Sequence, residues 1–464
     1  MGPDEIAGIR RRDLLKWGSA LGLTLPFGGV LLSACGASTQ STVKGGSGST
    51  DLSAFTSSKI DWKSQSGKTI VLGVLAHPWV TAIQPQLAQF QSLTGINVQL
   101  PLAGEDTYVQ KLPVTMASGS PTPDVLMVPA YGQAVQAGWL QPLDDYFSNS
   151  KLTDLAWYKQ SDVLPSAADF VKWQGKTTYG LPITAEVQIT FYRDDLITDA
   201  APLSTFEGLQ AAAVSAKTAG NLAGGIALRG KPTAGELAWP AAGYVFSYGG
   251  YIIDPSGKAA LDSPETVAGV QMYADIVKAA APKGVSTADW IAALAEMQQG
   301  QVAMFQDSSN ASSDLRDPSK SKVAASIKAA PFPAHNGKSN PNIWHWILGM
   351  NSKGQNKDAA WLFMQWATSA PASNAIAAAG GTPPRVSAWQ NPKFQTAYGP
   401  EIAASALKSL QSTDSKPMTA AWMNPKWPEV GQAFATAVNI AFTSGESAQS
   451  ALSAAQKTAQ AALA

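Results

Sequence analysis

The sequence contains one cysteine, Cys35, among its 464 residues. A single thiol cannot form an intramolecular disulfide, and the remainder of the chain has no cysteine for a zinc site or a catalytic thiol.

Histidines and hydrolase motifs are also scarce. The three histidines, His77, His335 and His345, are widely spaced and form no HExxH pair, so we expect no metal site and no cofactor. No Gly-x-Ser-x-Gly elbow occurs. The segment 225–231 has the spacing of a phosphate loop, but Pro232 replaces the serine or threonine that would contact magnesium. We interpret this segment as an ordinary loop.

Charge is sparse and balanced. Charged residues make up 14% of the chain, the formal net charge is zero, and no basic stripe is present. These features exclude nucleic acid as an expected partner. Beyond the first 35 residues no segment approaches 18 uncharged apolar residues, so the sequence predicts no membrane-spanning helix there.

The amino-terminal segment resembles two export signals. Arg11 and Arg12 precede an uncharged apolar stretch over 17–32, as in a Tat signal, and Leu-Ser-Ala-Cys ends at Cys35, as at a bacterial lipoprotein cleavage site. We expect 1–34 to be a signal peptide that is removed. Lipid on Cys35 would then anchor the protein to the outer face of the cell membrane.

The segment 35–66 is rich in serine, threonine and glycine, which indicates a flexible tether, with folded structure beginning near Lys68. The remaining length is too great for one hydrophobic core and predicts two domains.

Strands alternate with helices in the first part of the folded chain. A buried strand is expected at 69–75, an alternating strand at 96–100 and a third strand at 124–128, with helices between them. This order predicts a parallel sheet covered on both faces, with ligand bound beyond the carboxyl ends of its strands. Five candidate ligand-binding residues lie at those ends: His77, Trp79, Glu105, Asp106 and Tyr131.

Later helices carry clear start signals. Ser204 with Glu207 predicts a capping box, and Ser263 precedes Pro264 at the first position of a helix. The alanine-rich stretch 448–464 is also expected to be helical.

Several short motifs then occur in a common order. Ala137–Asp144 resembles the pattern aGxLxPLD, Gly175–Pro182 resembles GKxYGLP, and Gly380–Arg385 resembles GGxPPR. Further matches are Ala117–Gly119 with Pro123–Leu126, Phe191–Leu196, Gly300–Met304 and Ala330–Pro333. Together these motifs resemble the maltose-binding-like extracellular solute-binding proteins of ABC sugar importers.

The resemblance implies a periplasmic-binding-protein-like α/β fold, with two lobes, a hinge and a ligand cleft between the lobes. Residues 67–185 would form the first lobe, to which 345–400 return. Residues 186–344 would form the second lobe, to which 401–464 return. Crossings are expected near Pro182–Glu186 and Trp344–Leu348, with a third near residue 400.

The resemblance also adds candidate site residues. Glu186 stands before Tyr192 as the family's cleft glutamate stands before its tyrosine, and Trp239 lies where the family often places an aromatic ring. Where the family often has another tryptophan, this chain has the segment 307–310, so Asn310 offers a polar contact instead. The remaining candidates are Trp344 and Trp346, which share one face of a strand, and Arg385.

The implied function is capture of a sugar or oligosaccharide and its delivery to permease and ATPase subunits of an ABC importer, by a protein that acts as a monomer. A cleft of mixed carboxylates, one arginine and several rings fits neutral sugars best. A polyol, polyamine or phosphodiester remains an alternative ligand. An exported carbohydrate-active enzyme would need two carboxylates across the cleft, which Glu105 and Glu186 could supply. The lack of repeats disfavours an adhesin.

Overall fold

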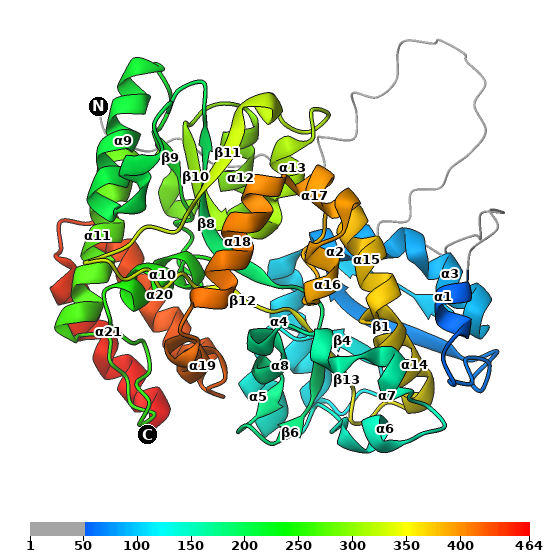
Figure 1. Cartoon of the computed structure of the whole chain (residues 1–464). Helices are drawn as coiled ribbons and strands as arrows, with labels where there is room; N and C mark the ends of the chain where they lie inside the picture. The colour runs from blue at the N-terminus through cyan, green and yellow to red at the C-terminus, as the bar shows by residue number, and fades with distance from the viewer. Residues whose placement is uncertain (1–51) are drawn as a thin grey trace, which may run out of the picture. The chain divides into compact units, whose positions relative to one another are not determined.

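The computed structural model describes residues 52–464, so the predicted signal peptide, Cys35 and the tether up to residue 51 lie outside the described residues. The described chain contains two larger β-sheets with helices packed around each, and these form two lobes (Figure 1). The helices are α1 (Ser53–Thr56), α2 (Pro78–Ile83), α3 (Leu87–Thr94), α4 (Glu105–Ala117), α5 (Tyr131–Gln136), α6 (Asp144–Ser148), α7 (Leu155–Tyr158), α8 (Pro165–Phe170), α9 (Phe206–Ala219), α10 (Ala238–Ser247), α11 (Pro264–Ala280), α12 (Trp290–Gln298), α13 (Ser312–Arg316), α14 (Lys357–Ala367), α15 (Ala370–Ala378), α16 (Val386–Trp389), α17 (Pro392–Tyr398), α18 (Pro400–Ser412), α19 (Lys416–Trp422), α20 (Trp427–Thr443) and α21 (Ala448–Leu463).

The first sheet has the strand order β2-β1-β4-β13-β7, and β3 also pairs with β1. Its strands are β1 (Thr69–Leu75), β2 (Asn97–Gln99), β3 (Leu102–Ala103), β4 (Val125–Met127), β7 (Gly180–Pro182) and β13 (Ile347–Met350). The pairs among β1 to β4 are parallel, as the alternation of strands and helices predicts. β13 runs antiparallel to both neighbours, because it enters this sheet on the return from the second lobe.

The second sheet has the order β11-β8-β10-β9, and the short β12 also pairs with β8. Its strands are β8 (Glu186–Arg193), β9 (Ile226–Ala227), β10 (Met304–Ser308), β11 (Ile327–Pro331) and β12 (Ile343–Trp344). A separate hairpin joins β5 (Lys172–Trp173) to β6 (Thr177–Thr178).

Two crossing segments connect the lobes side by side. The chain leaves the first sheet after β7 and enters the second at β8, and it returns from β12 to β13, at the places where the family resemblance implies crossings. The Ile183 amide donates to the Trp346 carbonyl at 2.7 Å, and the Trp346 amide donates to Thr184 Oγ1 at 3.0 Å. A third passage lies at Gly399, after which α18 packs on β8 and β11. The exact limits of each lobe stay a prediction.

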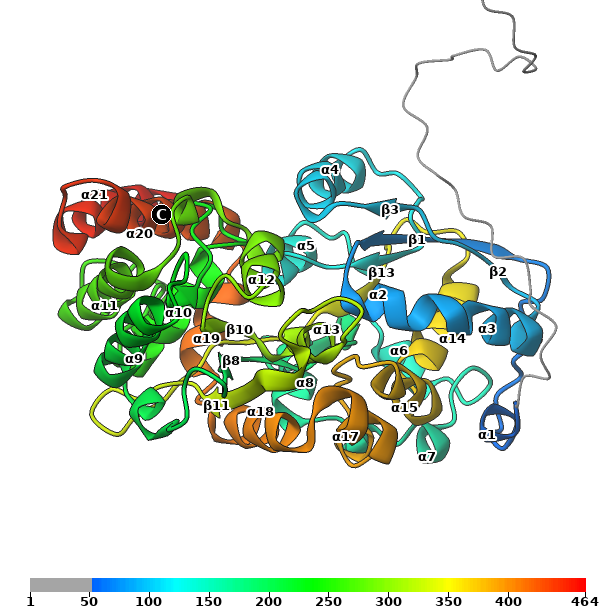
Figure 2. The same ribbon diagram turned by 90° about the horizontal axis from the view of Figure 1, so that it is seen from above.

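Helices cover each sheet closely (Figure 2). In the first lobe α14 is buried from Ala359 to Ala367 and packs against β1 and β13. In the second, α10 lies directly on β8. A Cβ on Gly243 of α10 would stand 2.0 Å from Gln188 Oε1, so a larger residue at this position would displace the Gln188 side chain.

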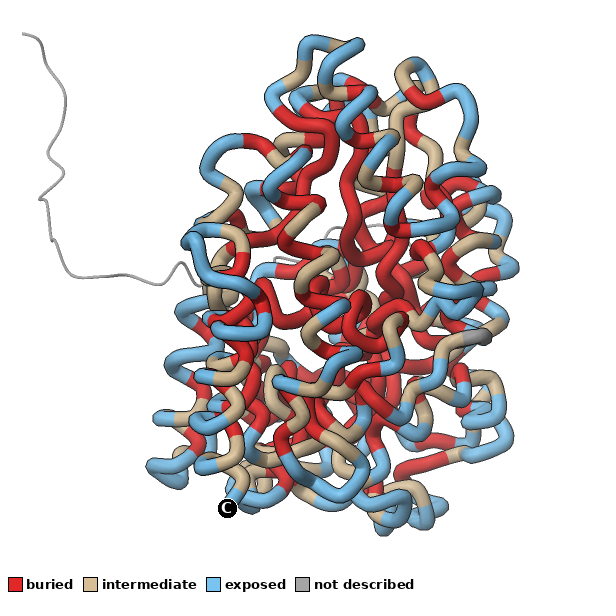
Figure 3. Tube along the Cα trace, turned by 90° about the vertical axis from the view of Figure 1, so that its left-hand side faces the viewer, coloured by how far each residue is buried: buried red, intermediate tan, exposed pale blue. Residues whose placement is uncertain are grey.

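The core of the second sheet contains polar side chains that bond to one another. Gln306 donates to Thr190 at 3.0 Å and accepts from Tyr244 at 2.5 Å, while Gln188 donates to the Pro240 carbonyl at 2.9 Å. Buried polar groups cost little when every partner is present. Figure 3 shows how the buried segments run through the interior and leave the exposed residues on outer turns.

The structure corrects two expectations. Residues 52–66 are not a free tether: α1 falls within them, and Phe55, Ile60 and Trp62 are buried against the first lobe. The prediction of a tether followed the high serine and glycine content and gave too little weight to these three apolar side chains. The capping residue of α9 is Thr205, which accepts from the Gly208 amide, because Ser204 ends a preceding 3-10 turn.

Two further searches concern the described residues only. Within 52–464, none of the helices combines the length and the apolar character that a bilayer crossing requires. The same part of the chain offers no cluster of three or more His, Cys, Asp or Glu arranged to hold a metal ion.

Trp62 provides a test of the packed amino-terminal segment. Its ring lies 5.6 Å from that of Trp157 and 6.3 Å from that of Phe55, and its Nε1–H donates to the Phe55 carbonyl. We expect Trp62→Ala to lower the free energy of unfolding by about 3 kcal/mol. The matched change Val214→Ala, at a side chain that is 41% exposed, should alter it by less than about 0.5 kcal/mol. Urea unfolding measures both, and equal effects would contradict the packing.

Candidate functional site

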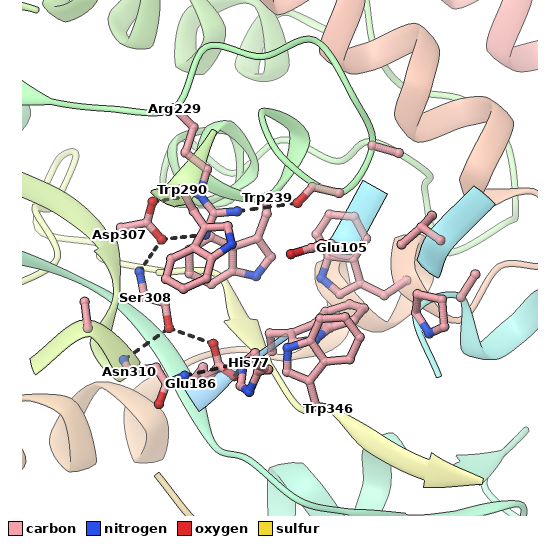
Figure 4. Close-up of a pocket in the computed structure, with 18 of the residues that line it drawn as sticks. His77, Glu105, Glu186, Arg229, Trp239, Trp290, Asp307, Ser308, Asn310 and Trp346 are labelled. Atoms are coloured by element: carbon pink, nitrogen blue, oxygen red, sulfur yellow. Dashed lines mark hydrogen bonds and ion pairs between the residues drawn. The ribbon is translucent and has the colours of Figure 1, made fainter. Parts of the chain in front are cut away.

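A cavity of about 150 Å³ lies between the two lobes. The first lobe contributes residues at the carboxyl ends of its strands, and the second contributes β10 and the loop before α10 (Figure 4). The charged and polar residues of its wall are His77, Glu105, Glu186, Arg229, Asp307, Ser308 and Asn310. The tryptophans of its wall are Trp239, Trp290, Trp344, Trp346, Trp422 and Trp427.

Arg229 contributes a guanidinium group to this wall, and its N–H donors bond to neighbouring carboxylates. Its Nε donates to Asp307 Oδ2 at 2.7 Å and its Nη2 to Asp307 Oδ1 at 2.6 Å, a bidentate pair. Its Nη1 lies 3.3 Å from Glu236 Oε2, and the guanidinium carbon stands 5.3 Å from the ring centre of Trp239. Burial alone would lower the pKa of Arg229, but the two carboxylates hold that pKa above its usual value.

Glu186 begins β8 and is buried, with 6% of its surface exposed. Its Oε2 accepts from Ser308 at 2.7 Å, and its Oε1 faces His77 Nε2 at 3.4 Å. Burial would raise the pKa of Glu186, but His77 and hydrogen bonds from Ser308 and Thr184 outweigh it, so the pKa is lowered. Glu186 therefore stays ionised at neutral pH.

His77 is held by the helix that follows β1. Its Nδ1 accepts from the Trp79 amide at 3.1 Å and caps α2. A neutral ring then carries its proton on Nε2, which faces Glu186 and lies 3.4 Å from the amide nitrogen of Asn310. His77 thereby joins the first lobe to Glu186 at the start of β8.

Glu105 occupies the first turn of α4 and has a different environment. Its carboxylate faces the loop before α10, where a Cβ on Gly235 would lie 3.7 Å from Glu105 Oε1. Burial, together with the nearby charge of Glu236, raises the pKa of Glu105 to about 7, and Arg229 opposes this only in part. No described residue donates a hydrogen bond to this carboxylate.

Two tryptophans in the wall present indole N–H groups without partners. Nε1 of Trp239 and Nε1 of Trp344 are buried, and no described residue accepts from either. Trp344 packs edge-on against Trp346, with ring centres 5.5 Å apart, and Trp422 packs edge-on against Trp427 at 3.9 Å. The wall thus combines flat apolar rings with unused hydrogen-bond donors.

The structure brings most of the predicted site residues together at this cavity. Those that line it are His77, Glu105, Glu186, Trp239, Asn310, Trp344 and Trp346. His345 takes the opposite side from its two tryptophan neighbours and is fully buried, with Nδ1 donating to the Thr184 carbonyl.

Trp79, Tyr131 and Arg385 do not line the cavity. Trp79 and Tyr131 are 1% and 2% exposed, because α2 and α5 turn these rings into the core of the first lobe. Tyr131 donates to the Val171 carbonyl. Arg385 is fully buried and binds the Thr368 and Lys159 carbonyls and Asp162, so it fixes a loop.

Asp106 also lies outside the cavity, one residue beyond Glu105. Its Oδ2 binds Lys231 Nζ at 2.6 Å, which ties α4 to the loop of the second lobe that carries Arg229. The Asp106 carboxylate therefore forms an ion pair between the two lobes and does not face the cavity.

Several residues that line the cavity were not predicted from the sequence as site residues. They are Arg229, Trp290, Asp307, Ser308, Trp422 and Trp427. The sequence indicates an ordinary loop over the segment 225–231, yet Arg229 of this segment lines the cavity. Asp307 and Ser308 stand in the polar segment that replaces the family's usual tryptophan. The late tryptophans had no local signal, since they reach the wall through the return of the chain near residue 400.

Comparison with known proteins agrees with this geometry. The family model described as bacterial extracellular solute-binding protein matches residues 78–374. The chain belongs to this family. The match confirms the expected solute-binding protein and its two-lobed fold.

Three similar proteins are named for, or contain, a sugar alcohol. The erythritol/L-threitol-binding protein of Mycolicibacterium smegmatis is 26% identical over 79% of each chain. The mannitol-binding protein of Pseudomonas aeruginosa is 28% identical over 76% of this chain and 83% of its own. The structure of a solute-binding protein from Agrobacterium vitis with bound D-mannitol superposes with a TM-score of 0.74 and 26% identity, over 85% of this chain and 98% of that one.

The raised pKa of Glu105 predicts a pH effect on stability. Between its ordinary value of 4.5 and about 7, the folded protein keeps a proton that the unfolded chain releases, so stability falls as pH rises through this window. Glu105→Gln removes that loss. We expect the unliganded variant to exceed the wild type at pH 8 by on the order of 1 to 2 kcal/mol and to match it at pH 4.5.

Thermal unfolding at both pH values measures the effect. Glu207→Gln, on the exposed side of α9, is the control and should leave the wild-type pH dependence intact. A Glu105→Gln variant whose stability tracks the wild type at every pH would show that the carboxylate is not perturbed.

Proposed function

We propose that this protein captures one polyhydroxylated solute, a monosaccharide or a sugar alcohol, in the cavity between its lobes. The observation that carries the proposal is the pairing of ionised carboxylates with tryptophans whose N–H groups have no partner. A hydroxyl both donates and accepts, so it suits Glu186 and the indoles of Trp239 and Trp344 alike. The C–H faces of such a solute pack on the rings.

Size and relatives narrow the ligand. A cavity of about 150 Å³ accommodates one ring or one short carbon chain. The relatives named for erythritol, L-threitol and mannitol support a sugar alcohol as the alternative to a cyclic sugar.

The same proposal extends to transport. Membership in an extracellular solute-binding family supports a protein outside the cytoplasm that passes its ligand to permease and ATPase subunits of an ABC importer. Lipid attachment at Cys35 would keep it near that importer, and capture of one small solute needs no second copy of the chain. The sequence signals at residues 11–35 support the anchor.

A glycosidase would use the two carboxylates Glu105 and Glu186 differently, as acid and nucleophile. Glu186 is engaged by Ser308 and faces His77, which favours binding over attack on a substrate. We therefore expect ligand to be recovered unchanged after long incubation with the protein. Chromatographic detection of hydrolysis products would replace the binding function with an enzymatic one.

The binding function is tested with a panel of monosaccharides and sugar alcohols, followed by tryptophan fluorescence. At least one member should bind, and Arg229→Lys should weaken it by about 100-fold, because lysine cannot replace the fork that holds Asp307.

Arg193→Lys is the matched control. Arg193 makes the same two-bond pair with Asp195, away from the cavity, so this variant should bind like the wild type. Circular dichroism would establish that both variants are folded. Wild-type affinity in a folded Arg229→Lys variant, or binding of another solute class in place of the panel, would contradict the proposal.

A further inference from the structure

The wall of the cavity holds more carboxylates than cations. Glu105, Glu186 and Asp307 line it, and Glu236 lies behind Arg229. Against them stand Arg229 and, when protonated, His77. Burying unmatched negative charge raises its free energy, and a cation at this place would offset that cost.

The excess lies at Glu105 and at Oε1 of Glu186, a buried oxygen that receives no hydrogen bond from the described residues and has only the His77 ring at 3.4 Å. Asp307 and Glu236 share Arg229, and Glu186 is held by Ser308 and His77. Glu105 faces the charges of Glu236, Arg229, Asp106 and Glu186, of which three are negative. In Figure 4 its carboxylate lies among the tryptophans, and no dashed line reaches it.

Neighbouring cations cannot satisfy Glu105. The guanidinium of Arg229 is committed to Asp307, Glu236 and the Gly235 carbonyl. Lys231, on the same loop, directs its Nζ to Asp106 at 2.6 Å and lies 3.8 Å from Asp289. Glu105 therefore has no cationic partner of its own among the described residues, and its half-buried carboxylate is open to a group of the ligand.

A second observation limits what the rest of that ligand is. Trp239, which is 7% exposed, and the half-buried Trp344 both line the cavity, and the Nε1 of each is buried with no acceptor among the described residues. Each needs an acceptor, which an ammonium group cannot provide and a hydroxyl can. A simple polyamine would leave these donors unpaired. The tryptophan faces also favour a cation placed over them.

We infer that the preferred ligand is an amino-bearing polyol, an amino sugar or an amino sugar alcohol, whose ammonium group pairs with Glu105 while its hydroxyls accept from Trp239 and Trp344. This inference rests on the proposed function and names the ligand class of the same cavity. It places Glu105 as the residue that distinguishes an amino from a hydroxyl group.

Two pairs of probes, each differing in one group, test the inference: D-mannitol with 1-amino-1-deoxy-D-mannitol, and D-glucitol with 1-amino-1-deoxy-D-glucitol. Calorimetry at pH 8 should give a dissociation constant at least about tenfold lower for the amino compound in at least one pair. Glu105→Gln should abolish that preference, since the amide has the same shape and no charge.

Asp106→Asn is the matched control, because it removes a carboxylate from the adjacent position outside the cavity. It should change the ratio of the two affinities far less than Glu105→Gln does, because Asp106 acts on the cavity only from a distance. A ratio that falls equally in both variants would overturn the role of Glu105.

Proton exchange provides a readout that a purely structural role would not move. At pH 7 Glu105 is about half protonated, and an ammonium beside it lowers its pKa, so binding of the amino compound should release protons. Calorimetry in buffers of different ionisation enthalpy measures this release, which Glu105→Gln should eliminate. Absence of proton release in the wild type would contradict the contact.

The outcomes distinguish failure of the inferred amino-bearing ligand from failure of the proposed binding function. Binding of neutral sugars or sugar alcohols with equal or higher affinity than their amino counterparts would overturn this inference and leave the proposed function standing. Failure of every neutral and amino probe to bind, in this set and in the panel, would overturn both.

Discussion

The guanidinium of Arg229 is buried in the wall between the lobes, and the surrounding structure has to match its charge. Asp307 meets it from β10, Glu236 from the following loop, and the Trp239 ring from α10. Replacing Arg229 would leave the two carboxylates buried without their shared cation. The loop from Arg229 to Trp239 is thereby fixed against the second sheet, and the same loop reaches the first lobe through Lys231 and Gly235. The shape of the cavity follows from how this one cation is held.

The two crossing segments position the wall residues that lie opposite the Arg229 loop. The two crossing segments bond to each other, and they carry Glu186, Trp344 and Trp346. His77, from the first lobe, meets Glu186 there. Because these groups sit where the chain passes between lobes, a ligand that touches them contacts both lobes at once, and its binding free energy favours the arrangement in which the lobes face each other. Capture and lobe position are therefore coupled through a few residues.

Local patterns in the sequence predicted the elements and the family but only part of the site. Strand ends and motif spacing identified His77, Glu105 and Glu186. The same rule misplaced Trp79 and Tyr131, because sequence position near a strand end does not determine which way a helix turns its ring. Trp422 and Trp427 could not be found in this way, since only the tertiary return of the chain brings them to the wall. The prediction of a flexible tether over residues 52–66 was wrong for another reason. Three large apolar side chains pack against the first lobe there, although the composition of the segment is mostly polar.

The central claim is that a polyhydroxylated ligand completes the hydrogen bonds that this cavity leaves open. A crystal structure of the protein with the tightest-binding solute tests it most directly. The account predicts ligand oxygens within hydrogen-bond distance of Nε1 of Trp239 and Nε1 of Trp344, and a ligand donor on a carboxylate of the wall. A ligand bound elsewhere, or one that occupies the cavity and leaves both indole N–H groups without a partner, would contradict it.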